Sequence, residues 1–467
     1  MVQAAACALA GEVRCLAREN ATDVMPGSPA SGHLFEGDFR LDIIRVEGGH
    51  AISGRVSVSG AKNSALKLMA ATLLAPGVTT LENVPNISDV HVMGKVLKRM
   101  GARIDVLDEH TLRIDTSQVD SWEAPYELVA KMRASTAVMG PLLGRFGKAK
   151  IAMPGGCNLG ARKIDMHILG LEAVGVEFDT DHGYIHATAP KGLAGASVTL
   201  EFASVGATEN LIMAAVRAKG TTVIDNAARE PEIVDLANML NAMGANITGA
   251  GTPVVTIEGV EELHPVTHRV VGDRIEAGTF IVAGALMADE SGVEVVGFNP
   301  IHLGMVIKKL EDMGVRIERI EGGVRVYRAE RLEPVDVQTL PFPGFPTDMQ
   351  AQIMVLSALA DGNSIITENI FENRFMFASE LVRMGANIRV EGHHAMVHGV
   401  RGFSGAQVTS PDLRGGAALA VAGLIAEGYT EVSAIHHIDR GYERFVDKLQ
   451  ALGAHVERVS VPDPIDD

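Results

Sequence analysis

Apolar and polar positions along the chain repeat with a period of about 70 residues, and the sequence holds six copies of this unit. Each copy contains an amphipathic run with apolar residues at helical spacing, and the run ends at a glycine. In the fourth copy the run from Leu303 to Met313 stops at Gly314, which supplies a left-handed helix end. The six stop glycines are Gly101, Gly175, Gly244, Gly314, Gly385 and Gly453.

Short β-rich segments flank this surface helix. In the fourth copy they are residues 292–296 before the helix and residues 315–320 and 324–327 after it. Gly322 and Gly323 join the last two segments as a hairpin turn. The pattern therefore predicts a strand, a surface helix and a strand pair in each unit.

Each copy also opens with a run that is apolar nearly all round and rich in Ala and Met. A helix without a polar face must be surrounded by protein. The predicted buried helices are 63–75, 126–146, 206–218, 274–288, 349–360 and 413–426. Three units that wrap their sheets around three such helices form one globular α/β domain, so six units predict two similar domains. Stacking as a solenoid is the alternative, although solenoid repeats usually span about 20–50 residues.

Length and charge narrow the class of protein. A chain of 467 residues is long enough for two large domains. Its formal net charge of -17 argues against nucleic acid or an anionic membrane as a partner, so an anionic substrate needs a local basic cluster. The longest apolar stretches, 277–288 and 415–426, are shorter than the ~20 residues that span a bilayer.

The three cysteines, Cys7, Cys15 and Cys157, form no disulfide framework and have no paired metal-ligand spacing. A reducing, cytoplasmic compartment and the absence of a metal site are therefore expected. Residues 1–40 lack the repeat, and their apolar stretch lacks a preceding basic region. We expect them to form a disordered extension.

Polar residues gather where the buried helices begin, and a helix start favours an anion. They are Lys62, Asn63, Ser204, Asp273, Arg274, Thr347, Asp348, Asp412 and Arg414. Helix capping is the alternative role for Ser204, Asp273, Thr347 and Asp412. Capping does not explain the cations Lys62 and Arg414, nor Arg133 within a predicted buried helix. A buried guanidinium needs either a structural carboxylate or a bound anion as its partner.

Cys157 lies between glycines in the segment MPGGCNLGARK, which predicts a loop rather than a helix or strand. A thiol near Arg162, Lys163 and His167 is suited to act as a nucleophile or an acid. The alternative is an inert buried cysteine, but core cysteines normally sit in packed elements.

Eight short strings follow one another along the chain: SGAKN (59–63), MRAS (132–135), PGGCNLGARKIDMH (154–167), SVGAT (204–208), NAAREPEIVD (226–235), FPTDMQAQ (345–352), ENRFM (372–376) and HIDRGYER (437–444). Taken together and in this order, they resemble the UDP-N-acetylglucosamine 1-carboxyvinyltransferase family. The resemblance covers residues 41 to about 460. It implies an enolpyruvyl transferase fold, in which two inside-out α/β domains of three units each close over substrates. The chain of this family crosses twice, so one domain is expected to hold residues 63–272 and the other residues 41–62 and 273–467.

The resemblance also implies the reaction. The enolpyruvyl group of phosphoenolpyruvate passes to the 3-hydroxyl of UDP-N-acetylglucosamine with release of phosphate, which is the first committed step of bacterial peptidoglycan precursor synthesis. Neither a cofactor nor a metal takes part. The expected state is a monomer or weak homo-oligomer in the cytoplasm, without a membrane or nucleic-acid partner.

Site residues follow from the same resemblance, residue by residue. Cys157 corresponds to the loop acid, and Asp348 to the carboxylate beside the sugar hydroxyl that acts as base. The groups that hold phosphoenolpyruvate are Lys62, Asn63, Arg162 and Arg440, Arg133 is shared between the substrates, and Arg414 adds positive charge. The UDP-sugar contacts are Arg162, Lys163, Ile164, Asp165, Met166, Phe202, Ala203, Ser204, Val205 and Ile370. Phe202 stands where many relatives have Lys, which removes one charged contact.

Two other functions remain open on the sequence. The sister transferase that uses shikimate 3-phosphate shares the fold and the donor, but it has Lys-Ser in place of Lys62 and Asn63 and no loop cysteine. A non-catalytic relative that binds a UDP-sugar is expected to have lost the acid, the base or the cations, and this chain keeps all of them.

Overall fold

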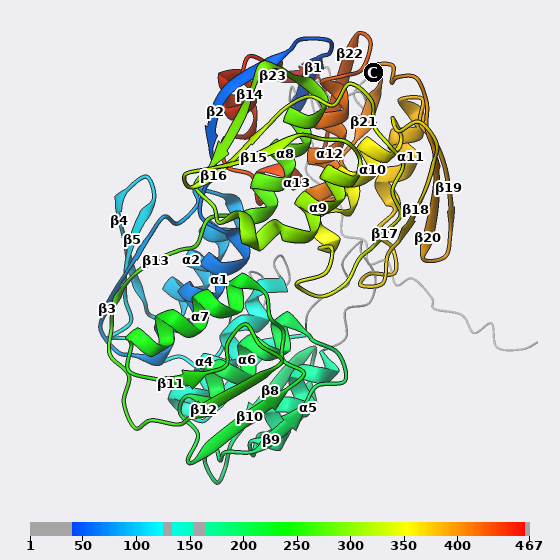
Figure 1. The fold of residues 1–467 in the computed structure, drawn as a ribbon. Coiled ribbons are helices and arrows are strands. Elements are labelled where there is room, and N and C mark those ends of the chain that lie inside the picture. The colour runs from blue at the N-terminus through cyan, green and yellow to red at the C-terminus, as the bar shows by residue number, and fades with distance from the viewer. Residues whose placement is uncertain (1–39, 125–132, 154–163, 463–467) are drawn as a thin grey trace, which may run out of the picture. The chain divides into compact units, whose positions relative to one another are not determined.

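The computed structural model describes residues 40–124, 133–153 and 164–462, with the side chains of residue 40 and of residues 133–135 excepted (Figure 1). Residues Arg40–Val461 form one compact unit of helices and strands. Within these ranges no helix is long and apolar enough to span a membrane.

The fourth unit shows the predicted order of elements. The buried helix α8 (Arg274–Met287) leads into β14 (Ala288–Val296), and η3 (Pro300–Leu303) and α9 (Gly304–Asp312) follow. The hairpin strands are β15 (Ile317–Ile320) and β16 (Gly323–Val326). β14 begins four residues before the predicted strand, because its first residue, Ala288, already pairs with Ile52 ahead of a register shift at Val293.

All six stop glycines adopt the left-handed backbone that the pattern predicts. Their φ angles lie between +91° and +105°. A side chain is disfavoured in this conformation, so glycine ends each surface helix at low cost. The same left-handed backbone geometry therefore recurs once in each repeat unit.

Three buried helices fill one of two hydrophobic cores. Every residue of α8 and of α10 (Gln350–Ser357) is buried, as is all of α12 (Leu413–Gly423) after its first residue. The three helices pack against one another (Figure 1). The other core, called the first core below, contains α1 (Lys62–Ala71), η1 (Thr72–Leu74), η2 (Arg133–Val138), α4 (Met139–Phe146) and α6 (Val205–Ala215). The core around α8, α10 and α12 is called the second core. In the first core the predicted helix 126–146 is a 3₁₀ turn followed by a short α-helix in its described part.

Six small sheets surround these helices. Three flank the first core: β13 (Thr267–Arg269), β3 (Val78–Glu82), β5 (Thr111–Asp115) and β4 (Arg103–Asp108); β6 (Lys148–Ala152), β8 (Tyr184–Thr188) and β7 (Glu177–Asp181); and β11 (Asn246–Thr248), β12 (Val254–Glu258), β10 (Thr221–Asp225) and β9 (Ser197–Thr199). Their surface helices are α2 (Ser88–Arg99), α5 (Asp165–Ala173) and α7 (Pro231–Ala242).

The other three sheets flank the second core. They are β15, β16, β14 and β2 (Ile52–Ser57); β17 (Val337–Gln338), β18 (Asn363–Thr367), β20 (His394–His398) and β19 (Asn387–Glu391); and β21 (Gln407–Thr409), β22 (Tyr429–Ser433), β1 (Arg40–Glu47) and β23 (His455–Pro462). The remaining helices are η4 (Thr347–Met349), α11 (Met376–Arg383), α13 (His436–Asp439) and α14 (Phe445–Ala451). In the sixth sheet, β1 comes from the start of the described chain.

Two chain segments connect the cores and run beside each other. β2 pairs with β14, whereas β13 pairs with β3, so residues 58–61 and 270–273 each pass from one core to the other. Gly60 and Gly272 form an antiparallel bridge. The Ala61 N–H donates to the Val271 carbonyl at 2.7 Å, and the Asp273 N–H donates to the Ser59 carbonyl at 2.9 Å. These two segments, residues 58–61 and 270–273, are together called the crossing. The starts of α1 and α8 lie next to each other at the crossing.

Substituting Gly60 by alanine tests how tightly this crossing is packed. A Cβ at Gly60 would lie 1.7 Å from the carbonyl oxygen of Asn83, so the backbone has to move. We expect Gly60→Ala to lower the free energy of unfolding by about 1–3 kcal/mol or more, measured by urea denaturation. Gly304→Ala is the matched control, because a Cβ there meets nothing within 4 Å. Equal stability of the two variants would contradict the packing.

A buried carboxylate fastens the crossing to the second core. Glu276 accepts a hydrogen bond from the Ser59 N–H at 2.8 Å and pairs with the Lys448 amine at 2.5 Å. Burial raises the pKa of Glu276 to about 7, against the opposing effect of Lys448. The folded state therefore holds a proton on Glu276 at a pH where the unfolded chain has lost it.

This shift predicts a pH dependence of stability with a definite sign. The contribution of the raised pKa is complete below the ordinary value of 4.5 and is lost as the pH rises through about 7. Relative to Glu276→Gln, the wild type should lose about 2–3 kcal/mol of unfolding free energy between pH 5 and pH 8. Parallel stability curves for the two proteins, measured in urea across this range, would contradict the assignment.

Candidate active site

Two cations from distant segments share one buried carboxylate. The Lys62 amine, at the start of α1, lies 2.8 Å from Oδ2 of Asp89. The Arg440 Nε, just after α13, lies 3.0 Å from Oδ1 of the same residue. Asp89 lies in the first turn of α2 and is 4% exposed. The fold thus places two of the predicted donor-binding groups side by side.

The protonation of this cluster depends on opposing effects. Burial lowers the pKa of Lys62, and the neighbouring Arg414 and Arg440 lower it further, whereas Asp89 raises it. The net shift is downward. For Asp89, burial would raise the pKa, but Lys62 and Arg440 outweigh burial and hold it below the ordinary value.

A second carboxylate, Asp348 in η4, is held by two arginines. Its Oδ1 lies 2.9 Å from Nη2 of Arg374, and its Oδ2 lies 3.1 Å from Nη2 of Arg414. Both guanidinium groups are at most 5% exposed, and Asp348 retains 25%. Burial would raise the pKa of Asp348, but the two arginines overcome it and hold the pKa far below its usual range. As it stands, Asp348 is an ionised and weakly basic group.

Arg274, which opens α8, is a structural cation. Its Nε and Nη2 pair with the carboxylate of Glu232 at 3.1 and 3.3 Å. Three of the four polar residues weighed as caps are caps: Ser204 on α6, Asp273 on α8 and Asp412 on α12 each accept backbone N–H groups of their helix. The capping role is wrong for Thr347, whose hydroxyl instead bonds to Glu368 at 2.9 Å and Arg374 at 3.0 Å.

The predicted UDP-sugar residues fall in two neighbouring helix starts and one loop. α5 begins at Asp165 and Met166, directly after Ile164. α6 begins at Val205, directly after Phe202, Ala203 and the cap Ser204. The two helices pack together, and His167 Nδ1 lies 3.1 Å from Nδ2 of Asn210 on α6. Phe202 is 41% exposed, which leaves its ring available to a ligand.

Ile370 belongs to the Asp348 side of the site. It lies in the loop after β18, where its N–H donates to Glu368 at 2.8 Å. Glu368 also accepts from Thr347, the neighbour of Asp348. Asn63, the second residue of α1, is exposed beside Lys62.

Four predicted site residues cannot be placed by their side chains. Cys157, Arg162 and Lys163 lie outside the described residues. The backbone of Arg133 belongs to η2, but its side chain is outside the description. Their assigned roles therefore stay predictions.

Two residues of the cluster were not singled out as site residues from the sequence. Asp89 follows Ser88 ahead of an amphipathic run, a pattern typical of a helix start, and nothing local signals its distant partners. Arg374 lies inside the string ENRFM that carried the resemblance, so the string held the signal.

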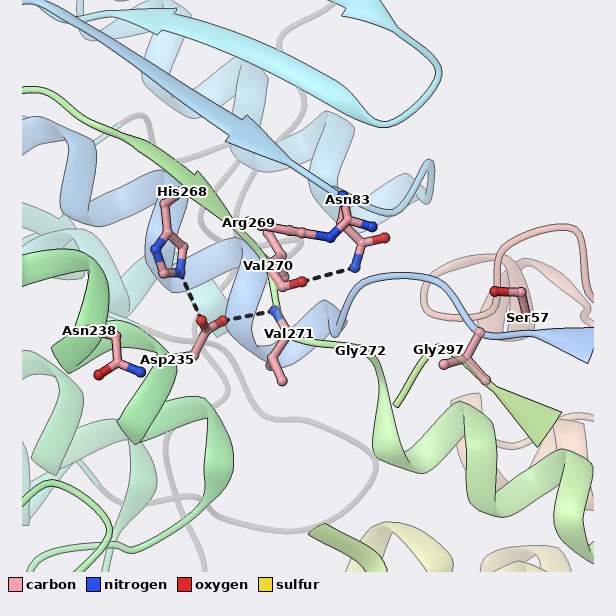
Figure 2. Close-up of a pocket in the computed structure, with 11 residues that line it drawn as sticks. Ser57, Asn83, Asp235, Asn238, His268, Arg269, Val270, Val271, Gly272 and Gly297 are labelled. Atoms are coloured by element: carbon pink, nitrogen blue, oxygen red, sulfur yellow. Dashed lines mark hydrogen bonds and ion pairs between the residues drawn. The ribbon is translucent and has the colours of Figure 1, made fainter. Parts of the chain in front are cut away.

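The described chain holds further polar groups besides this cluster. The two sets of His and Glu close enough to share a metal ion are Glu47, His50 and His455, and Glu109, His110 and Glu443. None of these is a predicted site residue. A cleft of about 560 Å³ lies along the crossing. Figure 2 shows the residues that line it, among them Asp235, which accepts hydrogen bonds from His268 at 2.8 Å and from the Val271 N–H at 3.1 Å.

Comparison with known proteins identifies the family. The family described as EPSP synthase (3-phosphoshikimate 1-carboxyvinyltransferase) matches residues 46–449. UDP-N-acetylglucosamine 1-carboxyvinyltransferase 2 of Carboxydothermus hydrogenoformans is 52% identical over 417 residues, which cover 89% of this chain and 99% of the relative. UDP-N-acetylglucosamine 1-carboxyvinyltransferase 1 of Caldanaerobacter subterraneus is 53% identical over 88% of this chain and 98% of the relative. The chain belongs to the enolpyruvyl transferase family.

Solved structures give the same fold. The enolpyruvyl transferase NikO from Streptomyces tendae aligns with a TM-score of 0.81 at 28% identity, over 91% of this chain and all of that one. EPSP synthase from Acinetobacter baumannii aligns with a TM-score of 0.69 at 18% identity, over 90% of this chain, and supports the fold alone. The predicted enolpyruvyl transferase fold of mixed α/β structure is confirmed.

Replacing Arg374 tests whether the ion pairs of Asp348 with Arg374 and Arg414 stabilise the folded protein. Arg374→Met breaks a buried ion pair and leaves Asp348 with one arginine. We expect a loss of about 2–4 kcal/mol in unfolding free energy, somewhat less than for a fully buried pair because Asp348 is partly exposed. Arg383→Met, on an exposed ion pair with Glu380 in α11, is the control and should change stability little. Equal urea midpoints of the two variants would contradict the network.

Proposed function

We propose that this enzyme transfers the enolpyruvyl group of phosphoenolpyruvate to the 3-hydroxyl of UDP-N-acetylglucosamine and releases phosphate. Relatives at 52% and 53% identity over nearly their full length carry that substrate in their names. The observation that carries the proposal within this chain is the convergence of Lys62, Arg440 and Arg414 at the crossing. Both substrates are strongly anionic, and a local cluster of cations lets a chain of net charge -17 bind them.

The proposed division of labour follows the sequence. Lys62, Asn63 and Arg440, with Arg162, hold the donor, and Arg133 lies between the substrates. The starts of α5 and α6 hold the UDP-sugar, together with Ile370. The cleft for both substrates lies between two domains, residues 63–272 and residues 41–62 with 273–467. The protein has two separate hydrophobic cores, one of residues within 65–270 and the other of residues within 44–58 and 275–456, and they support this division.

The chemistry needs an acid and a base on different sides of the donor's C2–C3 bond. Cys157 gives a proton to C3 while the sugar oxygen bonds to C2, and Asp348 takes the hydroxyl proton. The resulting ketal then loses a proton from C3 and expels phosphate, which leaves the enolpyruvyl ether. Asp348 is weakly basic while Arg374 and Arg414 hold it, so substrate anions that draw these arginines away would strengthen the base.

The setting that we infer is the cytoplasm, where such a soluble donor and a nucleotide sugar would meet. The product would serve peptidoglycan precursor synthesis, and the assembly would be a monomer or weak homo-oligomer.

Phosphate release decides between the proposed acceptor and its nearest rival. We expect release from phosphoenolpyruvate with UDP-N-acetylglucosamine, and none above background with shikimate 3-phosphate. The reverse preference would assign the enzyme to the sister activity. Binding of the UDP-sugar with no phosphate release above background from either acceptor would indicate a non-catalytic UDP-sugar-binding protein.

The acid role of Cys157 has its own test. Cys157→Ser should slow phosphate release by at least about a hundredfold, since a hydroxyl is a much weaker acid than a thiol. It should also abolish alkylation by an epoxide phosphonate such as fosfomycin, seen as a mass increase of the wild type. Cys7→Ser, in the region ahead of the repeats, is the matched control. An unchanged rate in Cys157→Ser would refute the acid role.

A further inference from the structure

Asp89 joins three segments that are far apart in the sequence. Its Oδ2 accepts from the Lys62 amine at 2.8 Å, and its Oδ1 accepts from the Arg440 Nε at 3.0 Å. A second, longer contact runs from Arg440 Nη2 to Oδ2 at 3.5 Å. Arg440 and Asp89 are 351 residues apart. One carboxylate thus fixes the distance between the two cations.

A simpler role for Asp89 is the stabilisation of α2 as an acidic residue in the first helical turn. That role needs only an exposed negative charge near the helix start. Asp89 instead is buried, and the Lys62 side chain that it meets is only 12% exposed. Desolvating two charges is costly unless each compensates the other. The helix dipole therefore does not account for this arrangement.

Among the described residues, the charged groups that act most strongly on the Lys62 amine are Asp89, Arg414 and Arg440. Arg414 and Arg440 repel its positive charge, and Asp89 attracts it. Asp273 accepts a hydrogen bond from the backbone N–H of Lys62 at 3.1 Å rather than from the amine. Gly441 follows Arg440, and a Cβ there would lie 3.1 Å from Cδ of Lys62, so this segment packs directly on the lysine side chain. Asp89 is thus the carboxylate that faces the amine itself.

We propose that Asp89 is a positioning residue, which keeps Lys62 protonated and holds the Arg440 guanidinium beside it, so that both cations meet the anionic donor together. The proposal rests on the proposed function for the identity of that donor. Without the carboxylate, burial and two neighbouring cations would favour a neutral Lys62 amine. A neutral amine no longer neutralises the charge of phosphoenolpyruvate, and the loss grows as the pH rises.

Three variants separate this role from a purely structural one. Asp89→Asn keeps the size and removes the charge, and Asp89→Glu keeps the charge. Asp105→Asn, in an ion pair of β4 with Arg103 and Arg113 nearer the surface, is the control. kcat/KM for phosphoenolpyruvate is measured from pH 6 to pH 10, with thermal midpoints recorded for each protein.

In Asp89→Asn, the alkaline limb of kcat/KM should move down by at least about one pH unit, the usual effect of losing an adjacent opposite charge. At a pH above both limbs, the loss relative to wild type should therefore be about tenfold greater than at pH 6.5. Asp89→Glu should restore the wild-type limb, and Asp105→Asn should leave it unchanged. An equal loss at every pH, or no loss, would overturn the proposal.

A second readout is independent of turnover. The rate of reductive methylation of Lys62, followed by peptide mass spectrometry across pH 7 to pH 10.5, reports the protonation of its amine. Lys62 should titrate at lower pH in Asp89→Asn than in wild type. If the wild type releases no phosphate but Lys62 shifts in this way, the proposed function fails and the positioning role stands. If the wild type turns over and Lys62 titrates alike in both, the positioning role fails.

Discussion

The antiparallel pairing of Gly60 with Gly272 is the constraint on which the site depends. A Cβ at Gly60 would lie 1.7 Å from the Asn83 carbonyl oxygen and one at Gly272 would lie 1.9 Å from the Gly297 carbonyl oxygen, so the backbone packed against each segment leaves no room for a side chain. Because α1 starts directly after one segment and α8 after the other, Lys62 and Asp273 lie together. The Lys62 N–H donates to the Asp273 carboxylate across this junction. The crossing therefore turns two helix starts from separate cores into one charged region.

Charge compensation then decides how that region is organised. Buried cations are costly without partners, and each buried cation here has a carboxylate: Lys62 has Asp89, Arg374 and Arg414 share Asp348, and Arg274 has Glu232. The half-buried Arg440 shares Asp89 with Lys62. Four of these cations, Lys62, Arg374, Arg414 and Arg440, meet three carboxylates, Asp89, Asp348 and Asp273. Such a group of cations favours an anionic donor, which a chain of net charge -17 would otherwise repel.

The repeated part of the fold was predictable because its signals are local. A glycine that ends a helix, such as Gly314, and an all-apolar run such as α8 identify themselves within a few residues. The sixth sheet was not predictable in this way, since β1 pairs with β22 at the other end of the chain. The period also gave no reason for the 3₁₀ turn of η2. Long-range pairing is set by tertiary packing, which a window of sequence does not contain.

The site residues likewise fall into those that local sequence predicted and those that depend on distant partners. Lys62, Asp348, Arg414 and Arg440 were found from helix starts and from family strings, and the structure brings them to the crossing. Asp89 was missed because its role depends on a partner 351 residues away. Thr347 was weighed as a cap, but its hydroxyl serves Glu368 and Arg374, which lie in later segments. Local chemistry thus predicted the cations but not the groups that position them.

A crystal structure of the enzyme with phosphoenolpyruvate would show whether the cations at the crossing bind the donor. We predict that the phosphate or carboxylate oxygens of the donor lie within hydrogen-bond distance of the Lys62 amine and the Arg440 guanidinium. Donor bound elsewhere, for example in the cleft beside His268 in Figure 2, with Lys62 and Arg440 paired only to Asp89, would contradict it.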